Sequence, residues 1–294
     1  MSRRQVILAI LSPAIFIALA HAQQPSFKTS VQTVAIYATV RDAQERSVAD
    51  LTKDDFEVLD NGKPVEITTF SSGRQPLTVA LLLDMSGSMN PSILRVREST
   101  RRFIDALLPE DRVRICTFGA EIAVSPILTN DKAVLTRIVN EELWPGGQTP
   151  LWNAMFAALQ SLAEEPGRRV VLALTDGADS GSLPGWKGSF NDVRNRATRE
   201  GFMLYMVGME DRKAPSEPKP EIAALIGDTG GAHFNVAPAD DLGATFARVA
   251  EELRRQYLIG FVPAADGREH RLTVRVKRPG LQARARTSYT AERR

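Results

Sequence analysis

The middle of the chain alternates between continuous apolar runs and amphipathic segments. Mostly apolar runs of strand length lie at 77–83, 170–174 and 202–207, and a further strand pattern lies at 113–118. Segments with apolar residues at helical spacing lie at 91–108, 131–139, 151–162, 191–200, 221–228 and 240–253. Unbroken apolar runs are typical of strands that are buried on both faces. Their alternation with helices predicts an α/β domain with a mostly parallel central sheet that is flanked by helices.

Both ends of the remaining chain have a β-type pattern. Residues 31–70 are rich in β-branched side chains, and Asn61-Gly62 separates two apolar runs as a hairpin turn does. Short alternating runs return at 257–289. Each flank is too small to form a good core alone. We therefore expect one smaller β-sandwich-like domain built from residues 23–75 and 256–294, with the α/β domain of residues 76–255 inserted between its halves.

The first 22 residues resemble an export signal. Two arginines precede an apolar run at 6–20, and a small-x-small cleavage pattern ends at Ala22. The run is shorter than the ~20 residues that span a membrane. Residues 1–22 therefore predict a cleaved signal peptide, a periplasmic or secreted protein, and no transmembrane segment after cleavage. An uncleaved anchor is the alternative, and the general secretory and twin-arginine routes both stay open.

Charge and composition exclude several classes of function. Without the two arginines of the leader, 35 basic residues balance 35 acidic ones, so net charge gives no reason to expect nucleic acid. Cys116 is the only cysteine, which rules out an intramolecular disulfide. It lies in an apolar run and is expected to be a buried thiol. His233 and His270 are far in sequence from the polar groups described next, which argues against zinc and against a histidine-based triad.

Oxygen-bearing side chains follow two of the buried runs. Asp84, Ser86 and Ser88 come directly after the run at 77–83, and Asp176 follows the run at 170–174. Ligands bind beyond the carboxyl ends of parallel strands, and hard cations prefer oxygen. Thr149, in a Gly-Gly loop, is placed like the N-cap of the next helix, with Pro150 at its first position. Taken singly, these residues fit turns and caps; together they predict an oxygen-only cation site.

The spacing Asp84-x-Ser86-x-Ser88, followed by Thr149 and then Thr175-Asp176-Gly177, resembles the metal-ion-dependent adhesion site (MIDAS) of von Willebrand factor type A (VWA) domains. The resemblance implies a Rossmann-like VWA fold and a bound Mg²⁺, or Mn²⁺ or Ca²⁺. Ser86 and Ser88 would bind the metal directly, and Asp84 mainly through water. The resemblance further implies adhesion or assembly without catalysis: the metal bridges to an Asp or Glu of a protein partner.

The flanking β segments extend this resemblance. Residues 48–64 and 257–286 look like those of exported bacterial proteins in an acidobacterial-type subgroup of VWA-related proteins.

Two other functions stay open. One is a hydrolase with Ser86 or Ser88 as nucleophile, although neither serine lies in a Gly-x-Ser-x-Gly turn. The other is a metal-free structural scaffold of the cell envelope.

Three further features have competing interpretations. Arg271, Arg275 and Lys277 share one face of a predicted strand, and Arg284 and Arg286 extend it across the hairpin; this face either contacts an anionic envelope polymer or is a solvated edge. Asp240-Asp241 is expected to cap a helix rather than to form a carboxylate pair. Trp144 either lines the rim of the metal site or is a packing residue in contact with its neighbours.

Overall fold

The computed structural model describes residues 33–176, 179–209 and 219–293. The predicted leader lies outside the described residues. A six-stranded sheet forms in the order β10-β9-β8-β5-β6-β7. Its strands are β5 (Thr78–Asp84), β6 (Arg112–Phe118), β7 (Ile122–Val124), β8 (Arg169–Thr175), β9 (Met203–Met209) and β10 (His233–Val236). All neighbours are parallel except β7, which runs antiparallel to β6. The prediction of a mostly parallel central sheet is confirmed.

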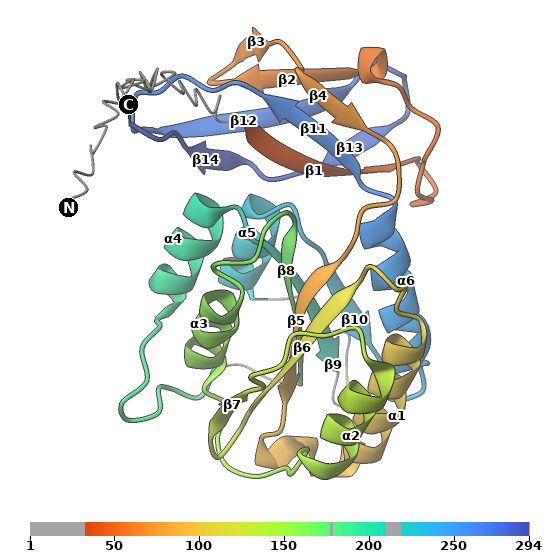
Figure 1. Cartoon of the computed structure of the whole chain (residues 1–294), viewed down its shortest axis with the longest axis vertical. Coiled ribbons are helices and arrows are strands. Elements are labelled where there is room, and N and C mark those ends of the chain that lie inside the picture. Colours follow the sequence, from red (N-terminus) through yellow and green to blue (C-terminus); the bar gives the residue numbers. More distant parts are fainter. Residues whose placement is uncertain (1–32, 177–178, 210–218, 294) are drawn as a thin grey trace, which may run out of the picture. The chain divides into compact units, whose positions relative to one another are not determined.

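Helices cover both faces of this sheet (Figure 1). They are α1 (Ile93–Asp105), α2 (Lys132–Glu141), α3 (Leu151–Ser161), α4 (Phe190–Glu200), α5 (Pro220–Asp228) and α6 (Leu242–Arg254). Strand β5 shows why its sequence is apolar throughout. Leu81 and Leu83 pack in the core beneath α1, α2 and α6, whereas Ala80 and Leu82 pack beneath α3, α4 and α5. Neither face of β5 therefore tolerates a polar residue until the strand ends at Asp84.

The order of the strands creates a switch point beside β5. The chain passes from β5 through α1 to β6 on one side, and the next parallel strand, β8, pairs with the other side of β5. Connections that leave the carboxyl ends of β5 and β8 therefore diverge to opposite faces of the sheet. Such a divergence opens a crevice beyond the strand ends, where α/β proteins bind ligands.

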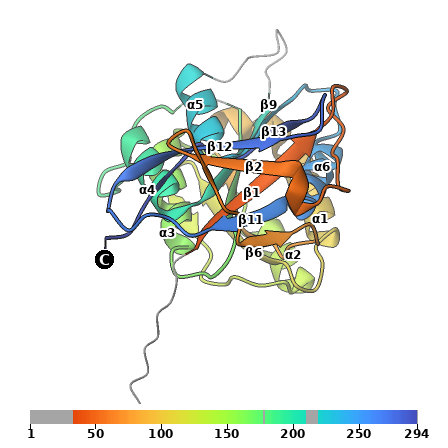
Figure 2. The same ribbon diagram turned by 90° about the horizontal axis from the view of Figure 1, so that it is seen from above.

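Strands from the two flanks form two antiparallel sheets, here called the sandwich. One sheet has the order β13-β1-β11-β4 and the other β14-β12-β2-β3. Their bounds are β1 (Val34–Arg41), β2 (Phe56–Asp60), β3 (Lys63–Val65), β4 (Thr69–Ser71), β11 (Tyr257–Phe261), β12 (Glu269–Val276), β13 (Gln282–Arg284) and β14 (Ser288–Thr290). Figure 2 shows strands of both sheets overlapping in the view from above. They share one core that contains Ile36, Phe56 and Tyr257, so each sheet mixes strands from before and after the α/β domain.

Several local predictions are confirmed. Asn61 and Gly62 form the β2–β3 turn with φ of 48° and 80°, the left-handed region that this dipeptide tolerates. Asp241 caps α6 by accepting hydrogen bonds from two backbone N–H groups. Cys116 is fully buried in β6, and burial raises the pKa of its thiol to about 12, so the thiol stays protonated. Across the part of the chain that the structure describes, no helix has the length and apolar character needed to cross a membrane.

Candidate metal centre

Adjacent strands bring the carboxylate of Asp84 to the crevice. In the register of β5 and β8, Leu83 lies opposite Leu174, so Asp84 and Thr175 end their strands side by side. The Thr175 hydroxyl donates a hydrogen bond to Asp84 Oδ2 at 2.6 Å, and the Ser86 N–H donates to Oδ1 at 2.8 Å. Both carboxylate oxygens are thus held by neutral donors. Asp84 is fully buried.

The two serines connect this carboxylate to Asp176. Ser86 Oγ lies 3.0 Å from Ser88 Oγ, and the Ser88 hydroxyl donates to Asp176 Oδ1 at 3.1 Å. Ser86 occupies the N-cap position of the short helix η2 (Gly87–Ser92), yet its side chain does not cap that helix. A serine at this position normally accepts a bond from the first turn. Here its hydroxyl faces Ser88 instead, so four of the five predicted residues form one connected cluster.

The loop that carries Thr149 is anchored to the same place. The Gly146 N–H donates to the Met85 carbonyl at 2.6 Å, and the Gly87 N–H donates to the Gly147 carbonyl at 3.1 Å. Thr149 is itself buried, and its backbone is tied to Ser180: the Thr149 N–H donates to Ser180 Oγ, and the Ser180 N–H donates to the Thr149 carbonyl. These bonds hold the loop between the Asp84 segment and the segment that follows β8.

One expectation about Thr149 is wrong. Pro150, not Thr149, is the N-cap of α3, and the Trp152 N–H in the first turn donates instead to Asp179 Oδ1 at 3.3 Å. The reason is conformational, because Pro150 has ψ of 62°, outside the helical range, and the first helical residue is therefore Leu151. Thr149 has no capping role that would explain a hydroxyl residue at this position.

Two glycines allow the three segments to approach each other. A Cβ on Gly119, which follows β6, would lie 2.6 Å from both the Gly146 and the Met85 carbonyl oxygens. Gly147 has φ of +80°, and a Cβ there would lie 2.3 Å from Ala120 Cα. Backbone packing this close excludes any side chain at either position. The donors are therefore held by a rigid backbone frame rather than by flexible loops.

The electrostatics of the cluster are unbalanced. Desolvation by burial raises the pKa of Asp84; hydrogen bonds from Ser86 and Thr175 oppose this shift, and the nearby Asp176 charge adds to it. Among the described residues, no Lys or Arg forms an ion pair with Asp84 or Asp176. A buried carboxylate without a cationic partner is costly, and proteins normally pair such a group or use it to bind a metal.

The donor set fits a hard divalent cation. It consists of two carboxylates and the hydroxyls of Ser86, Ser88 and Thr149, all oxygen. Within residues 33–176, 179–209 and 219–293, no group of three or more His, Cys, Asp or Glu side chains is placed to hold a metal. The sequence interpretation assigned no role to Thr175 or Ser180. Thr175 follows the apolar run directly and could have been found; Ser180 lies in a loop and gave no signal.

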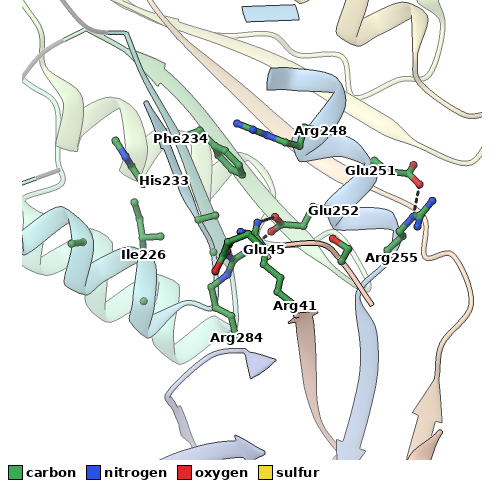
Figure 3. A pocket seen from close by; sticks show the side chains of 15 residues that line it. Arg41, Glu45, Ile226, His233, Phe234, Arg248, Glu251, Glu252, Arg255 and Arg284 are labelled. Carbon is green, nitrogen blue, oxygen red and sulfur yellow. Dashed lines mark hydrogen bonds and ion pairs between the residues drawn. The ribbon is translucent and has the colours of Figure 1, made fainter. Parts of the chain in front are cut away.

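A second polar region lies between the sandwich and α6. Here a cavity of about 760 Å³ is lined by residues of β1, α5, β10, α6 and β13 (Figure 3). Its centre is Glu252, which is buried and accepts hydrogen bonds from Arg41, Arg284 and the Tyr205 hydroxyl. Glu251 pairs with Arg255 at 2.6 Å. The Glu251 and Glu252 carboxylates at this cavity are therefore paired with arginines of the chain itself. We call this region the junction, because its ion pairs connect α6 with the sandwich.

This junction corrects the prediction for the basic hairpin. Arg284 does not extend the exposed face of β12, because it binds Glu252. Arg286 donates to the Thr198 and Ser288 carbonyls, and burial lowers the pKa of its guanidinium to about 10. Of the five basic residues in that prediction, only Arg271 and Arg275 on β12 and Lys277 directly after it stay exposed. Binding of an anionic polymer to them stays a prediction.

Comparisons with known proteins agree with this architecture. Residues 79–178 match the sequence profile of the von Willebrand factor type A domain. The structure resembles a von Willebrand factor type A protein from Catenulispora acidiphila, with a TM-score of 0.51 at 14% identity, covering 90% of this chain and 76% of that one. No curated protein matches the sequence.

Two pilus proteins are also similar over part of the chain. The vWF domain of the type V pili tip protein Mfa5 from Porphyromonas gingivalis has a TM-score of 0.47 at 14% identity, covering 60% of this chain and 95% of that one. The PilB minor pilin from Streptococcus sanguinis has a TM-score of 0.46 at 14% identity, covering 63% of each chain. The profile match over residues 79–178 and the mostly parallel sheet lead to one conclusion: the α/β part of this chain has the von Willebrand factor type A fold.

Proposed function

We propose that this protein is an exported, metal-dependent binding module. Asp84, Ser86, Ser88, Thr149 and Asp176 hold a divalent cation, Mg²⁺ or else Mn²⁺ or Ca²⁺, at the carboxyl ends of β5 and β8. The cation supplies a Lewis-acidic position that binds an Asp or Glu carboxylate of a protein partner. VWA domains commonly serve in protein interaction and adhesion, in line with this use.

One observation carries the proposal: Asp84 is fully buried and has only neutral hydrogen-bond partners among the described residues. Burying an ionised carboxylate has an effective cost of roughly several kcal/mol, even after the protein relaxes, when nothing compensates its charge. A cation at the cluster would compensate that charge. Ser86, which leaves its capping bond unmade, would contribute a hydroxyl oxygen to the same ion.

Export and domain division belong to the proposal as well. The leader pattern at 1–22 supports secretion to the periplasm or beyond. We propose residues 23–75 and 256–294 as the sandwich and residues 76–255 as the inserted VWA domain. The sandwich would then present the VWA domain to its partner, and the crevice beyond β5 and β8 would be the binding face.

Binding is favoured over hydrolysis by the position of the histidines. Among the described residues, His270 lies in the sandwich, where it contacts Asp60 and Asp266. His233 lines the junction cavity. Neither is placed to take a proton from Ser86 or Ser88, and a serine nucleophile needs a base within hydrogen-bond reach.

A chelation experiment tests the proposal. Wild-type protein and the Asp84→Asn variant are immobilised and exposed to extracts of the source cell envelope in Mg²⁺ and in EDTA. We expect a partner that binds wild type in Mg²⁺, is released by EDTA and rebinds when Mg²⁺ is restored. Asp84→Asn should lose at least about 100-fold in Mg²⁺ affinity, at the upper end of the losses seen when groups around a metal are changed.

The matched control is Glu121→Gln, which removes an exposed carboxylate in the loop after β6. It should bind metal and partner as wild type does. Partner binding that persists in EDTA would contradict the proposal. Failure of wild type to bind any divalent cation in calorimetry would instead favour a metal-free scaffold.

A further inference from the structure

Large apolar side chains are exposed beside the candidate metal centre. Among the described residues, the two most exposed large hydrophobic side chains are Leu94 and Trp144, each 74% accessible. Both lie on segments that carry the predicted donors: Leu94 follows Ser88 at the start of α1, and Trp144 precedes Gly146. Single exposed hydrophobic residues are common on protein surfaces, but a group of them commonly marks an interaction site.

Contacts between α1 and α2 bring these two residues together. Arg101 donates to the Asn140 side chain, and Arg97 donates to the Leu143 carbonyl, so α1 and the end of α2 run antiparallel. Residues three apart on a helix lie on the same face. One turn before Arg97, Leu94 therefore lies beside the segment that begins at Trp144. We call the two exposed apolar side chains, Leu94 and Trp144, together with the Arg97 side chain that lies against the Trp144 ring, the patch.

Trp144 is held in a fixed orientation. Its Nε1–H donates to the Glu141 carbonyl at 2.8 Å, and the Arg97 guanidinium carbon lies 5.9 Å from the centre of its ring. A tryptophan that is already ordered loses little conformational entropy when a partner covers it. Exposed yet ordered tryptophans of this kind are typical of residues that dominate binding energy in interfaces.

Charge indicates which side of the patch faces a carboxylate. The Arg97 guanidinium lies against the Trp144 ring and provides positive charge at the patch, whereas Glu141 and Glu142 are exposed at the end of α2. With a cation bound at the cluster, a partner carboxylate is attracted to the centre and repelled from the end of α2. The partner residues on either side of that carboxylate would then pass over Leu94 and Trp144.

We infer that the partner presents an Asp or Glu with a large apolar side chain close to it in sequence, and that this side chain packs on Leu94 and Trp144. The inference rests on the proposed metal-dependent function and specifies the partner beyond its carboxylate. The carboxylate would give dependence on the metal, and the apolar neighbour would give selectivity among acidic segments.

Two synthetic peptides test the inference on the full-length protein. Acetyl-Gly-Ser-Leu-Asp-Phe-Ser-Gly-amide has apolar neighbours beside its aspartate, and acetyl-Gly-Ser-Ser-Asp-Ser-Ser-Gly-amide has none. Binding in Mg²⁺ is followed by NMR through the indole N–H signals. Wild type should bind the first peptide about tenfold more tightly than the second, the factor that 1.4 kcal/mol gives. Both peptides should be released by EDTA.

Substitutions then assign the preference to the patch. Trp144→Ala and Leu94→Ala should each remove most of the tenfold preference and leave Mg²⁺ affinity unchanged. Ile127→Ala removes another exposed apolar side chain, 44% accessible, in the loop after β7, and it should keep the preference. If wild type binds both peptides equally and only in Mg²⁺, the inference is overturned while the proposed function stands.

Other outcomes are equally decisive. A preference for the first peptide that persists in Trp144→Ala would show that its apolar side chains do not pack on the patch, and would overturn the inference. Self-association that depends on Trp144 would assign the patch to a second copy of the chain and would also overturn it. If neither peptide binds in a Mg²⁺-dependent way, the proposed function fails and the inference fails with it.

Discussion

Two buried carboxylates in this protein differ in the charge of their hydrogen-bond partners. Glu252, at the junction between α6 and the sandwich, is bound by Arg41, Arg284 and the Tyr205 hydroxyl. Asp84, at the end of β5, is bound by one backbone N–H and one hydroxyl, both neutral. Both side chains are almost fully removed from solvent. Of the two, only Glu252 has its charge balanced by arginines of the described residues.

We propose that this difference distinguishes a structural carboxylate, Glu252, from a carboxylate that binds a cation, Asp84. A buried ion pair holds elements together when both partners are present, and it is strongly destabilising when one partner is removed. A buried carboxylate without a cation makes the folded protein less stable, and a second carboxylate, Asp176, lies within reach of the same serines. Such an arrangement is expected where the missing charge is brought by a ligand.

The largest expected effect on stability comes from the junction. Glu252→Gln removes the charge that balances Arg41 and Arg284, so we expect the free energy of unfolding to fall by about 3 kcal/mol. Urea denaturation of the metal-free protein measures this change. Mg²⁺ affinity should stay as in wild type, because Glu252 is not among the predicted metal-binding residues.

Glu45 offers the matched control for that variant. Its carboxylate also pairs with Arg41, at 2.7 Å, but its side chain is 75% exposed. Glu45→Gln should cost less than about 1 kcal/mol, as exposed pairs do. Equal losses in the two variants would remove the distinction between a buried and an exposed partner at this junction.

A smaller effect is expected from pH. Burial raises the pKa of Asp84, and a bound cation requires the carboxylate to be ionised. As pH falls through this raised pKa, protons compete with Mg²⁺, and the dissociation constant should rise by about tenfold per pH unit for one proton. The stability of the metal-free protein should change in the opposite direction. Because the raised pKa means that the folded state favours protonated Asp84, this group increases the free energy of unfolding as pH falls.

Calorimetric titrations with Mg²⁺ at several pH values check this linkage. The decline in affinity should begin at a higher pH than that of a solvent-exposed aspartate. An affinity that stays constant down to the ordinary aspartate range would show that Asp84 does not ionise with metal binding.

The α/β fold and the position of Asp84 at a strand end were predictable from local sequence. Runs such as Leu77–Leu83 are apolar on both faces because both faces are covered, and a polar residue directly after such a run lies at a strand end. What the sequence did not predict depends on distant partners. From the sequence Arg284 is expected to be part of an exposed basic face, but its partner Glu252 lies on α6, 32 positions earlier in the chain.

The role of Thr149 was misjudged for a related reason. Ser-, Thr- or Asp-before-helix patterns predict caps from local sequence alone. The ψ angle of Pro150 and the reciprocal bonds with Ser180 set the local geometry instead, and Ser180 lies 31 positions further along the chain. Such contacts cannot be inferred from spacing.

The stability of Asp84→Asn with and without Mg²⁺ tests the central claim most directly. Asparagine removes the charge of Asp84 and can still accept from the Ser86 N–H, while the Thr175 hydroxyl can turn and accept a hydrogen bond from the new amide nitrogen. In EDTA we therefore predict that the variant is at least as stable as wild type. At a Mg²⁺ concentration of 100 times its dissociation constant, wild type should gain about 2.7 kcal/mol and the variant nothing. If the variant is clearly less stable in EDTA and Mg²⁺ does not stabilise wild type, Asp84 is a structural residue and the account is contradicted.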